Sequence, residues 1–203
     1  MCRRIEQPYA RARAYGSYDG NLRGLIHLLK YEQVRPAARV LGGLLAQAMA
    51  RLLVESGNGL RVVVPVPLHS SRLRQRGFNQ AELIARAALD SISGSAAADL
   101  HLRTGVLRRN RPTDTQTGLT RHQRRENIRG AFELTRPEEI AGKEVLLVDD
   151  VFTTGTTVSE CAKVLRRAGA ERVVVATVAR VMKGETASII GADRVKAVEV
   201  SQA

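Results

Sequence analysis

Apolar side chains recur with helical spacing in two segments near the N-terminus. The first covers residues 22–29, and Asp19 is the candidate N-cap of the helix that it predicts. The second begins at Pro36, a favourable first position of a helix, and its apolar face continues over residues 40–53. The turn-rich sequence SGNG at residues 56–59 predicts its end.

Three valine-rich runs have the length and composition of strands that are buried on both faces of a sheet. They cover residues 61–67, 144–148 and 172–178, and a fourth candidate covers residues 195–200. Amphipathic helices are predicted at residues 79–92, with Asn79 as a candidate N-cap, and at residues 156–168. Such alternation predicts an α/β fold with a parallel sheet flanked by helices.

Two polar segments interrupt this alternation. Residues 68–78 are basic and turn-rich. Residues 108–125 contain almost no apolar side chain, which predicts a long functional loop that becomes helical from Thr120 onward. Short strands are predicted before and after this loop, at residues 106–107 and 131–134.

Composition narrows the class of protein. The 203 residues suit one α/β domain, and an apolar share of 44% is enough for a core. The longest apolar run, residues 40–54, contains Arg51 and two glycines, so we expect it to be too polar and too short for a membrane span. The N-terminus lacks the apolar core of a signal peptide. Cys2 and Cys161 form no CxxC pair, so no zinc site or disulfide framework is indicated, and a reducing cytoplasm is the predicted location.

The net charge of +12 predicts attraction to polyanions such as nucleic acid or phosphorylated metabolites. The alternative is a basic solvated surface without a specific partner. Aromatic residues make up only 3% and there is no Trp, which argues against a dedicated single-strand binding module, because such modules stack bases on several rings.

The strongest chemical signal is VDDVFTTGTT at residues 148–157, which follows a buried strand and opens a helix. Ligands bind at this position in open parallel sheets. The turn combines backbone N–H groups, hydroxyls and the positive end of a helix dipole, which suit a phosphate. Its members are Thr153, Thr154, Gly155, Thr156 and Thr157. Asp149 and Asp150 suit ribose hydroxyls and can orient Mg²⁺ indirectly.

The alternative interpretation is a strand-to-helix turn whose Asp and Thr side chains only cap the helix. The run is not a Walker A loop, because GxxxxGK[ST] is absent from the sequence, and no GxGxxG motif opens a helix.

The run resembles the diphosphoribosyl-binding signature of type I phosphoribosyltransferases: an apolar strand, two acidic residues, a spacer and Thr-Thr-Gly-Thr. The resemblance implies that Asp149 and Asp150 hold the ribose hydroxyls of 5-phosphoribosyl 1-diphosphate (PRPP) and that the turn at residues 153–157 binds its 5-phosphate. It also implies Mg²⁺ as a cofactor, held through PRPP and not by direct protein ligands. Thr153 stands where 6-oxopurine transferases carry an Asp, so the run is closer to the orotate type.

Further motifs resemble the ComF/GntX family of phosphoribosyltransferase-like proteins, over about residues 15–180. They are Leu29-Lys30-Tyr31, VPVPLH at residues 64–69, Arg72, RGFNQ at residues 76–80, and elements of residues 115–132. The resemblance implies a type I phosphoribosyltransferase-like fold with an N-terminal hood at residues 1–35, a core at 36–180 and a C-terminal extension at 181–203. Relatives usually carry a zinc ribbon with CxxC pairs, of which Cys2 alone is present, so neither a metal nor a ribbon-mediated partner is carried over.

In the family fold, the loop after the first core strand holds pyrophosphate, which implies that Arg72 and Arg76 bind it through their forked donors. The alternative is a solvated basic turn, and His69 stays unassigned. Three residues of the hood either contact the acceptor or serve packing. They are Tyr18, Lys30 and Tyr31.

Residues 108–125 resemble the flexible catalytic loop of the family. Loop closure would bring a cation to the departing pyrophosphate and exclude water. Arg109 and Arg121 are the catalytic candidates, although the sequence does not choose between them and Arg111, Arg124 and Arg125.

Two functions stay open. In the first, the protein is an enzyme that transfers the phosphoribosyl group of Mg²⁺-bound PRPP to a nitrogenous acceptor. In the second, it is a non-catalytic PRPP-, nucleotide- or single-stranded-DNA-binding accessory of competence and DNA uptake. A homodimer is the candidate assembly, and the sequence does not identify the acceptor.

Overall fold

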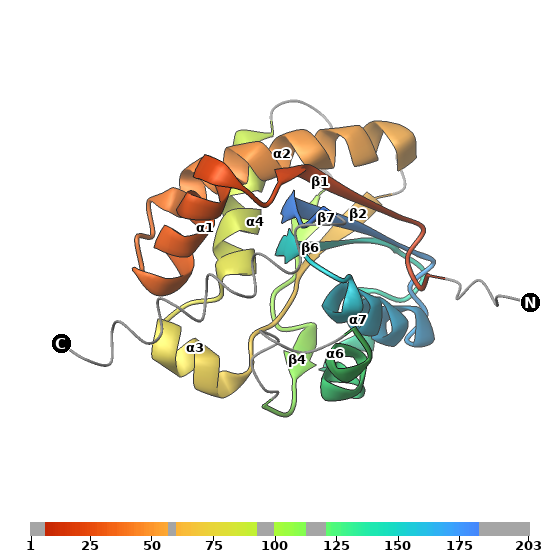
Figure 1. The fold of residues 1–203 in the computed structure, drawn as a ribbon. Coiled ribbons are helices and arrows are strands. Elements are labelled where there is room, and N and C mark those ends of the chain that lie inside the picture. Colours follow the sequence, from red (N-terminus) through yellow and green to blue (C-terminus); the bar gives the residue numbers. More distant parts are fainter. Residues whose placement is uncertain (1–6, 57–59, 93–99, 113–120, 183–203) are drawn as a thin grey trace, which may run out of the picture.

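A five-stranded parallel sheet with the order β1-β7-β6-β2-β3 forms the centre of the molecule (Figure 1). The computed structural model describes residues 7–56, 60–92, 100–112 and 121–182. The strands are β1 (Arg11–Ser17), β2 (Leu60–Pro65), β3 (His101–Leu102), β6 (Glu144–Phe152) and β7 (Arg172–Arg180). The predicted α/β fold class is confirmed, because the three valine-rich runs form the central strands β2, β6 and β7.

Helices cover both faces of this sheet (Figure 1). One face carries α1 (Gly20–Tyr31), α2 (Ala37–Ser56) and α4 (Gln80–Ser91). The other carries α7 (Thr156–Arg167), α6 (Arg121–Ile128) and the antiparallel pair of β4 (Leu107–Arg109) and β5 (Phe132–Leu134). A short helix, α3 (Ser70–Arg76), follows β2, and a 3-10 turn covers Pro137–Glu139.

Strand β6 separates two apolar cores. Leu146 and Val148 belong to the core beneath α1, α2 and α4, whereas Val145 and Leu147 belong to the core beneath α7. This alternation is the period of two that a strand imposes on its side chains. The same alternation determines which core each carboxylate at the end of β6 faces.

Helix α2 packs closely against α4. A Cβ atom at Gly42 would lie 2.4 Å from the Cβ atom of Ala87, so only a glycine permits this approach. By length and composition alone, residues 37–55 of this helix could cross a membrane, so the expectation that the apolar run is too short and too polar was wrong on those two criteria. In the fold, half of that stretch is buried.

The structure differs from the predicted elements in three places. Residues 11–17 of the predicted hood form β1, an edge strand that pairs with β7. The basic segment at residues 68–78 contains α3, and His69 caps it by accepting a hydrogen bond from Ser71 N at 3.3 Å. The predicted loop at residues 108–125 is shorter, because Arg108 and Arg109 pair within β4.

Other predictions concern the second half of the polar loop and the two ends of the chain. Helix α6 confirms the helical end of the predicted loop. Cys2, the candidate strand at residues 195–200 and most of the predicted C-terminal extension lie outside the described residues. The division into hood, core and extension stays a prediction.

Candidate functional site

Strand β6 carries the two candidate ribose ligands. The strand does not end at Val148 as predicted: it continues to Phe152, and Asp149 pairs in register with Thr177 of β7. Because side chains alternate between faces, Asp149 continues the series that faces α7, and Asp150 continues the series that faces α1. Two adjacent carboxylates therefore enter different surroundings.

Asp149 is partly buried and lies next to a second acid, the buried Asp150. Its Oδ1 accepts a hydrogen bond from the backbone N of Asp150 at 2.9 Å. Burial and the negative charge of Asp150 raise the pKa of Asp149 from 3.8 to about 7, while the charges of Lys30 and Arg109 oppose this rise. Near neutral pH, Asp149 is therefore poised between its charged and neutral forms.

Cys161 of α7 lies fully buried in the same core as Val145 and Leu147. Burial and the nearby charge of Asp149 raise the pKa of its thiol well above the ordinary value. Cys161 is a free thiol, so it contributes to this core as a small buried side chain.

Asp150 forms an ion pair with Lys30 of α1. The Lys30 Nζ and Asp150 Oδ2 atoms are 2.7 Å apart, and the two side chains are 17% and 6% exposed. Burial disfavours the charged ammonium, but the charge and the hydrogen bond of Asp150 outweigh burial, and the pKa of Lys30 is raised. From the sequence, Lys30 was considered a possible contact of the acceptor, and this ion pair was not predicted. The spacing of Ile26 and Lys30, i and i+4 on one helical face, could have indicated that Lys30 points inward, because Ile26 is buried.

The turn after β6 is shaped by Gly155. This residue is the N-cap of α7 and adopts φ 73°, and a Cβ atom there would lie 2.6 Å from Cζ of Phe152. No side chain caps the helix at this residue, which argues against the interpretation that the Asp and Thr residues only cap it. The first N–H groups of a helix have no intrahelical acceptor and can bind an anion.

The threonines of the turn differ in exposure. Thr153 is exposed, whereas Thr154, Thr156 and Thr157 are partly buried. The hydroxyls of Thr154 and Thr156 are 2.8 Å apart, within hydrogen-bond distance, so both lie on one side of the turn. The structure thus brings together the residues predicted to bind phosphate.

Helix α3 carries Arg72 and Arg76, and Arg76 lies near Asp150. Arg76 donates a hydrogen bond to Gln80 Oε1 at 2.6 Å, and its guanidinium lies 5.9 Å from the ring centre of Tyr31. Burial lowers the pKa of Arg76, and the charge of Arg72 adds to this effect, whereas the charges of Asp150 and Tyr31 oppose it. Arg76 therefore interacts electrostatically with both Asp150 and Arg72.

Arg109, at the end of β4, approaches the same region from the other face of the sheet. Its guanidinium lies 5.6 Å from the ring centre of Phe132. Burial lowers its pKa, the charge of Arg72 lowers it further, and the charge of Asp149 opposes both. Arg72 is thus electrostatically coupled to both Arg109 and Arg76.

The remaining candidate residues have no described contact with the two carboxylates. Arg121 is the first residue of α6, but its side chain is not among those that the structure describes. Arg111 donates a hydrogen bond to the carbonyl of Arg129 at 2.7 Å. Tyr18 is buried and its hydroxyl lies 3.1 Å from His27 Nε2, whereas Tyr31 is 65% exposed. Packing accounts for Tyr18, and Tyr31 stays available at the rim.

Asn79 links the end of β2 to α4. Its Oδ1 accepts from Ala81 N at 3.0 Å, which confirms the predicted cap, and its Nδ2 donates to the carbonyl of Val66 at 3.0 Å. These bonds tie α4 to the chain that leads into α3 and its arginines.

The arrangement suits a ligand that carries vicinal hydroxyls, a monophosphate and a second anionic group. The carboxylates can accept bonds from hydroxyls, the turn can donate to a phosphate, and the arginines can neutralise a further anion. Among the residues that the structure describes, no cluster of three or more His, Cys, Asp or Glu side chains could hold a metal ion.

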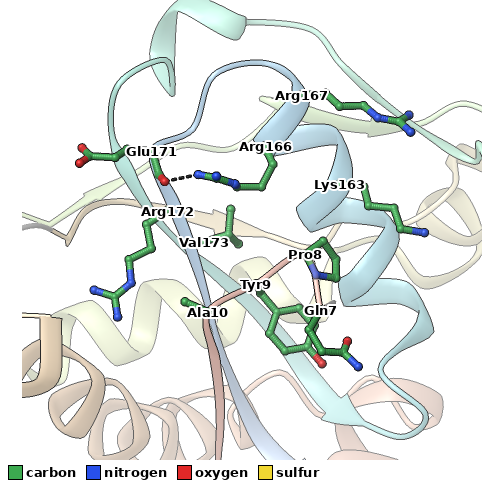
Figure 2. Close-up of a pocket in the computed structure, with 10 residues that line it drawn as sticks. All are labelled: Gln7, Pro8, Tyr9, Ala10, Lys163, Arg166, Arg167, Glu171, Arg172 and Val173. Atoms are coloured by element: carbon green, nitrogen blue, oxygen red, sulfur yellow. Dashed lines mark hydrogen bonds between the residues drawn. The ribbon is translucent and has the colours of Figure 1, made fainter. Parts of the chain in front are cut away.

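A separate hollow of about 520 Å³ lies at the opposite end of α7, between its last turns, the start of β7 and the N-terminal segment (Figure 2). Arg166 donates to the backbone carbonyls that follow α7 (Figure 2). Lys163 pairs with Glu160, and Arg172 pairs with Glu144 at 3.5 Å. Three of its basic side chains are thus already engaged, and the negative end of a helix dipole disfavours an anion there.

Comparison with known proteins agrees with this geometry. Residues 44–202 match the phosphoribosyl transferase domain family. The DNA utilization protein YhgH of Salmonella typhimurium is 35% identical over 177 residues, which cover 86% of this chain and 74% of that protein. Competence protein F of Haemophilus influenzae is 38% identical over 119 residues, 58% of this chain and 49% of that protein. Competence protein ComFC of Bacillus subtilis is 32% identical over 108 residues, 53% and 39% of the two chains.

Proposed function

Because this chain belongs to the ComF/GntX family of phosphoribosyltransferase-like proteins, we propose that it binds PRPP with Mg²⁺ at the carboxyl ends of β2 and β6. One observation carries the proposal. Two carboxylates and a glycine-capped turn follow each other at the end of one buried parallel strand, so acceptors for hydroxyls and donors for a phosphate lie within one short segment of chain.

The residues divide the ligand between them. Asp149 and Asp150 accept hydrogen bonds from the two ribose hydroxyls, and the turn at residues 153–157 donates to the 5-phosphate. Arg72 and Arg76 of α3 bind pyrophosphate, since Arg76 lies near Asp150 and the charge of Arg72 lies near that of Arg76. Arg109 lies near both Asp149 and Arg72, which supports a role at the leaving group.

Mg²⁺ fits this site as a partner of the ligand. Magnesium commonly keeps several waters and takes only one or two carboxylates besides substrate phosphates. In this proposal the ion is held through the diphosphate of PRPP, and Asp149 and Asp150 orient it only indirectly, through the ribose hydroxyls that they bind. When bound, the ion would neutralise charge on the diphosphate oxygens.

In the proposed reaction, the bond between ribose C1 and the pyrophosphate oxygen breaks, and a bond forms from C1 to a nitrogen of the acceptor. Pyrophosphate leaves with the bonding electron pair, and the acceptor loses a proton. The protein contributes by fixing the ribose and by placing positive charge where negative charge grows.

A second candidate function is binding of single-stranded DNA. The net charge of +12 favours it, as do the names of two relatives, a DNA utilization protein and a competence protein. The low aromatic content, 3%, argues for contacts with the phosphate backbone over base stacking. The two functions are compatible, because the ribose site need not overlap the basic surface.

Calorimetric titration of PRPP, with and without Mg²⁺, tests the first function. We expect Mg²⁺-dependent binding by the wild-type protein and its loss in Asp149→Asn/Asp150→Asn. The matched control is Asp19→Asn/Asp90→Asn, which makes the same charge change at two exposed positions. An absence of binding by folded wild-type protein, or equal binding by both double variants, would contradict the proposal.

Salt titration of single-stranded DNA binding tests the second function. Binding through phosphates weakens steeply with salt, with a slope of roughly −0.7 per neutralised phosphate in a plot of log affinity against log salt. A flat salt dependence, or no binding at low salt, would exclude this contribution of the basic surface.

A further inference from the structure

We infer that Lys30 is a positioning residue of the ribose site: its ion pair with Asp150 docks helix α1 on the end of β6 and holds that carboxylate in place. The inference rests on the proposed function, because it concerns the residue expected to bind a ribose hydroxyl. Lys30 acts through Asp150 and is not itself placed on the ligand.

The geometry of the pair is specific. Lys30 Nζ lies 2.7 Å from Asp150 Oδ2, and both side chains are largely buried. Lys30 neighbours Leu29 and follows Ile26 by one helical turn, and both of these side chains are 1% exposed. The buried face of α1 thus leads directly to the ammonium group, and movement of α1 would move the partner of Asp150.

The pair also leaves Asp150 able to bind a ligand. A carboxylate offers about four lone-pair positions on its two oxygens, and Lys30 is placed on Oδ2. Lys30 therefore orients the carboxylate without filling its acceptor capacity. On the same helix, Tyr31 lies with its ring centre 5.9 Å from the guanidinium of Arg76, so docking of α1 also defines the rim of the site.

Lys30 supplies charge to both carboxylates. It opposes the rise of the pKa of Asp149, although its ion pair is with Asp150. Other charged or titratable groups interact with Lys30, Asp149 or Asp150 from the elements around them. They are Tyr18 before α1, Tyr31 at its end, Arg76 on α3, Arg109 on β4 and Cys161 on α7.

The first measurement needs no ligand. Carboxyl ¹³C chemical shifts of labelled aspartates, assigned with Asp149→Asn, report the titration of Asp149 in Lys30→Met, Lys30→Arg and Lys143→Met. Lys143 precedes β6 at its opposite end, so Lys143→Met removes the same charge far from the carboxylates. We expect Lys30→Met to raise the pKa of Asp149 above about 7, and the other two variants to leave it unchanged.

The second measurement is PRPP affinity as a function of pH. We expect Lys30→Met to bind at least about tenfold more weakly at pH 7, a factor that corresponds to about 1.4 kcal/mol, and to shift the pH profile upward. Lys30→Arg should retain most of the affinity because it keeps the charge, and Lys143→Met should match the wild type.

The outcomes separate the inference from the proposed function. If wild-type protein binds PRPP and Lys30→Met binds equally well with the same pH profile, the inference fails and the function stands. If no protein binds PRPP, the ligand-free titration still decides: an unchanged Asp149 pKa in Lys30→Met overturns the electrostatic role. Should Lys30→Met not fold, Lys30→Gln is measured in the same way, and an unshifted Asp149 titration there also overturns it.

Discussion

The two ends of strand β6 handle their charges in opposite ways. At its N-terminal end, Glu144 pairs with Arg172 at 3.5 Å, and nearby basic side chains bind acids or backbone carbonyls at the surface. At its C-terminal end, the partly buried Asp149 adjoins the buried Asp150, and Lys30 pairs only with Asp150. Burial and the remaining repulsion between the two carboxylates raise the pKa of Asp149.

The ends of α7 repeat this contrast in the backbone. Arg166 binds the carbonyls that follow the C-terminal end, so that end is satisfied by its own side chains. The N-terminal end begins at Gly155 without a side-chain cap. The proposed site therefore rests on the combination of an uncapped helix start with an adjoining carboxylate of raised pKa, and not on basic side chains alone.

The largest expected effect is on the buried ion pair. Lys30→Met leaves Asp150 buried without its partner, which should lower the free energy of unfolding by about 3–5 kcal/mol in urea denaturation. Lys143→Met should lower it by only about 1 kcal/mol, because it removes one hydrogen bond, from Lys143 to the Glu139 carbonyl. The double variant Lys30→Met/Asp150→Asn should recover much of the loss, because it removes both charges. Equal effects of Lys30→Met and Lys143→Met would show that the two ends do not differ.

The next effect concerns two glycines that flank β6, Gly142 before the strand and Gly155 after it. Gly155 and Gly142 have φ of 73° and 69°, but only Gly155 has a close neighbour, Phe152, whereas nothing lies within 4 Å of a Cβ atom at Gly142. Gly142→Ala should lower the free energy of unfolding by about 1–2 kcal/mol through backbone strain alone. Gly155→Ala should lower it by about 2–4 kcal/mol and weaken binding of ribose 5-phosphate.

Denaturant titration and calorimetry measure these two effects. Equal losses for the two glycine variants would show that contact with Phe152 contributes nothing. Unchanged phosphate binding by Gly155→Ala would remove the turn from the proposed site.

A smaller and pH-dependent effect is expected at Asp149. The folded protein binds this proton more tightly than the ordinary value of 3.8 implies, with a pKa of about 7. Stability is therefore lost as pH rises from about 4 to about 7, and the full penalty remains above 7. Asp149→Asn keeps an oxygen for the Asp150 N–H and removes the charge. It should raise the Tm at pH 8 by a few degrees and leave it unchanged near pH 4; a gain of equal size at both pH values would contradict this account.

The central strands and the place of the candidate site could be predicted from the sequence. Valine-rich runs specify strands such as β6 and β7 by local composition, and VDDVFTTGTT joins two acidic residues and the turn proposed to bind phosphate within one short segment. Both signals are local. Strand β1 was missed, because its alternating Arg and Ala residues have low strand propensity, and it is held by pairing with β7 and by contacts of Arg11 and Arg13 with Glu55.

The internal arrangement of the site could not be predicted in the same way. That Asp149 faces α7 and Asp150 faces α1 follows from the register of β6 with two cores, which depends on the whole sheet. The ion pair of Lys30 depends on where α1 crosses the end of the sheet. His69 illustrates the same limit, since its role as the cap of α3 became apparent only with the helix.

The smallest expected effect is at the other end of α7. Lys163 and Glu160 form an i, i+3 pair in which the lysine is 44% exposed, so Lys163→Gln should lower the free energy of unfolding by about 0.2–0.5 kcal/mol. PRPP affinity should stay unchanged, because the substitution lies at the far end of the helix from Gly155. Urea denaturation and calorimetric titration check both values. A clear loss of PRPP affinity would mean that the basic hollow and the carboxylate site act together, and the contrast between the two ends would no longer hold.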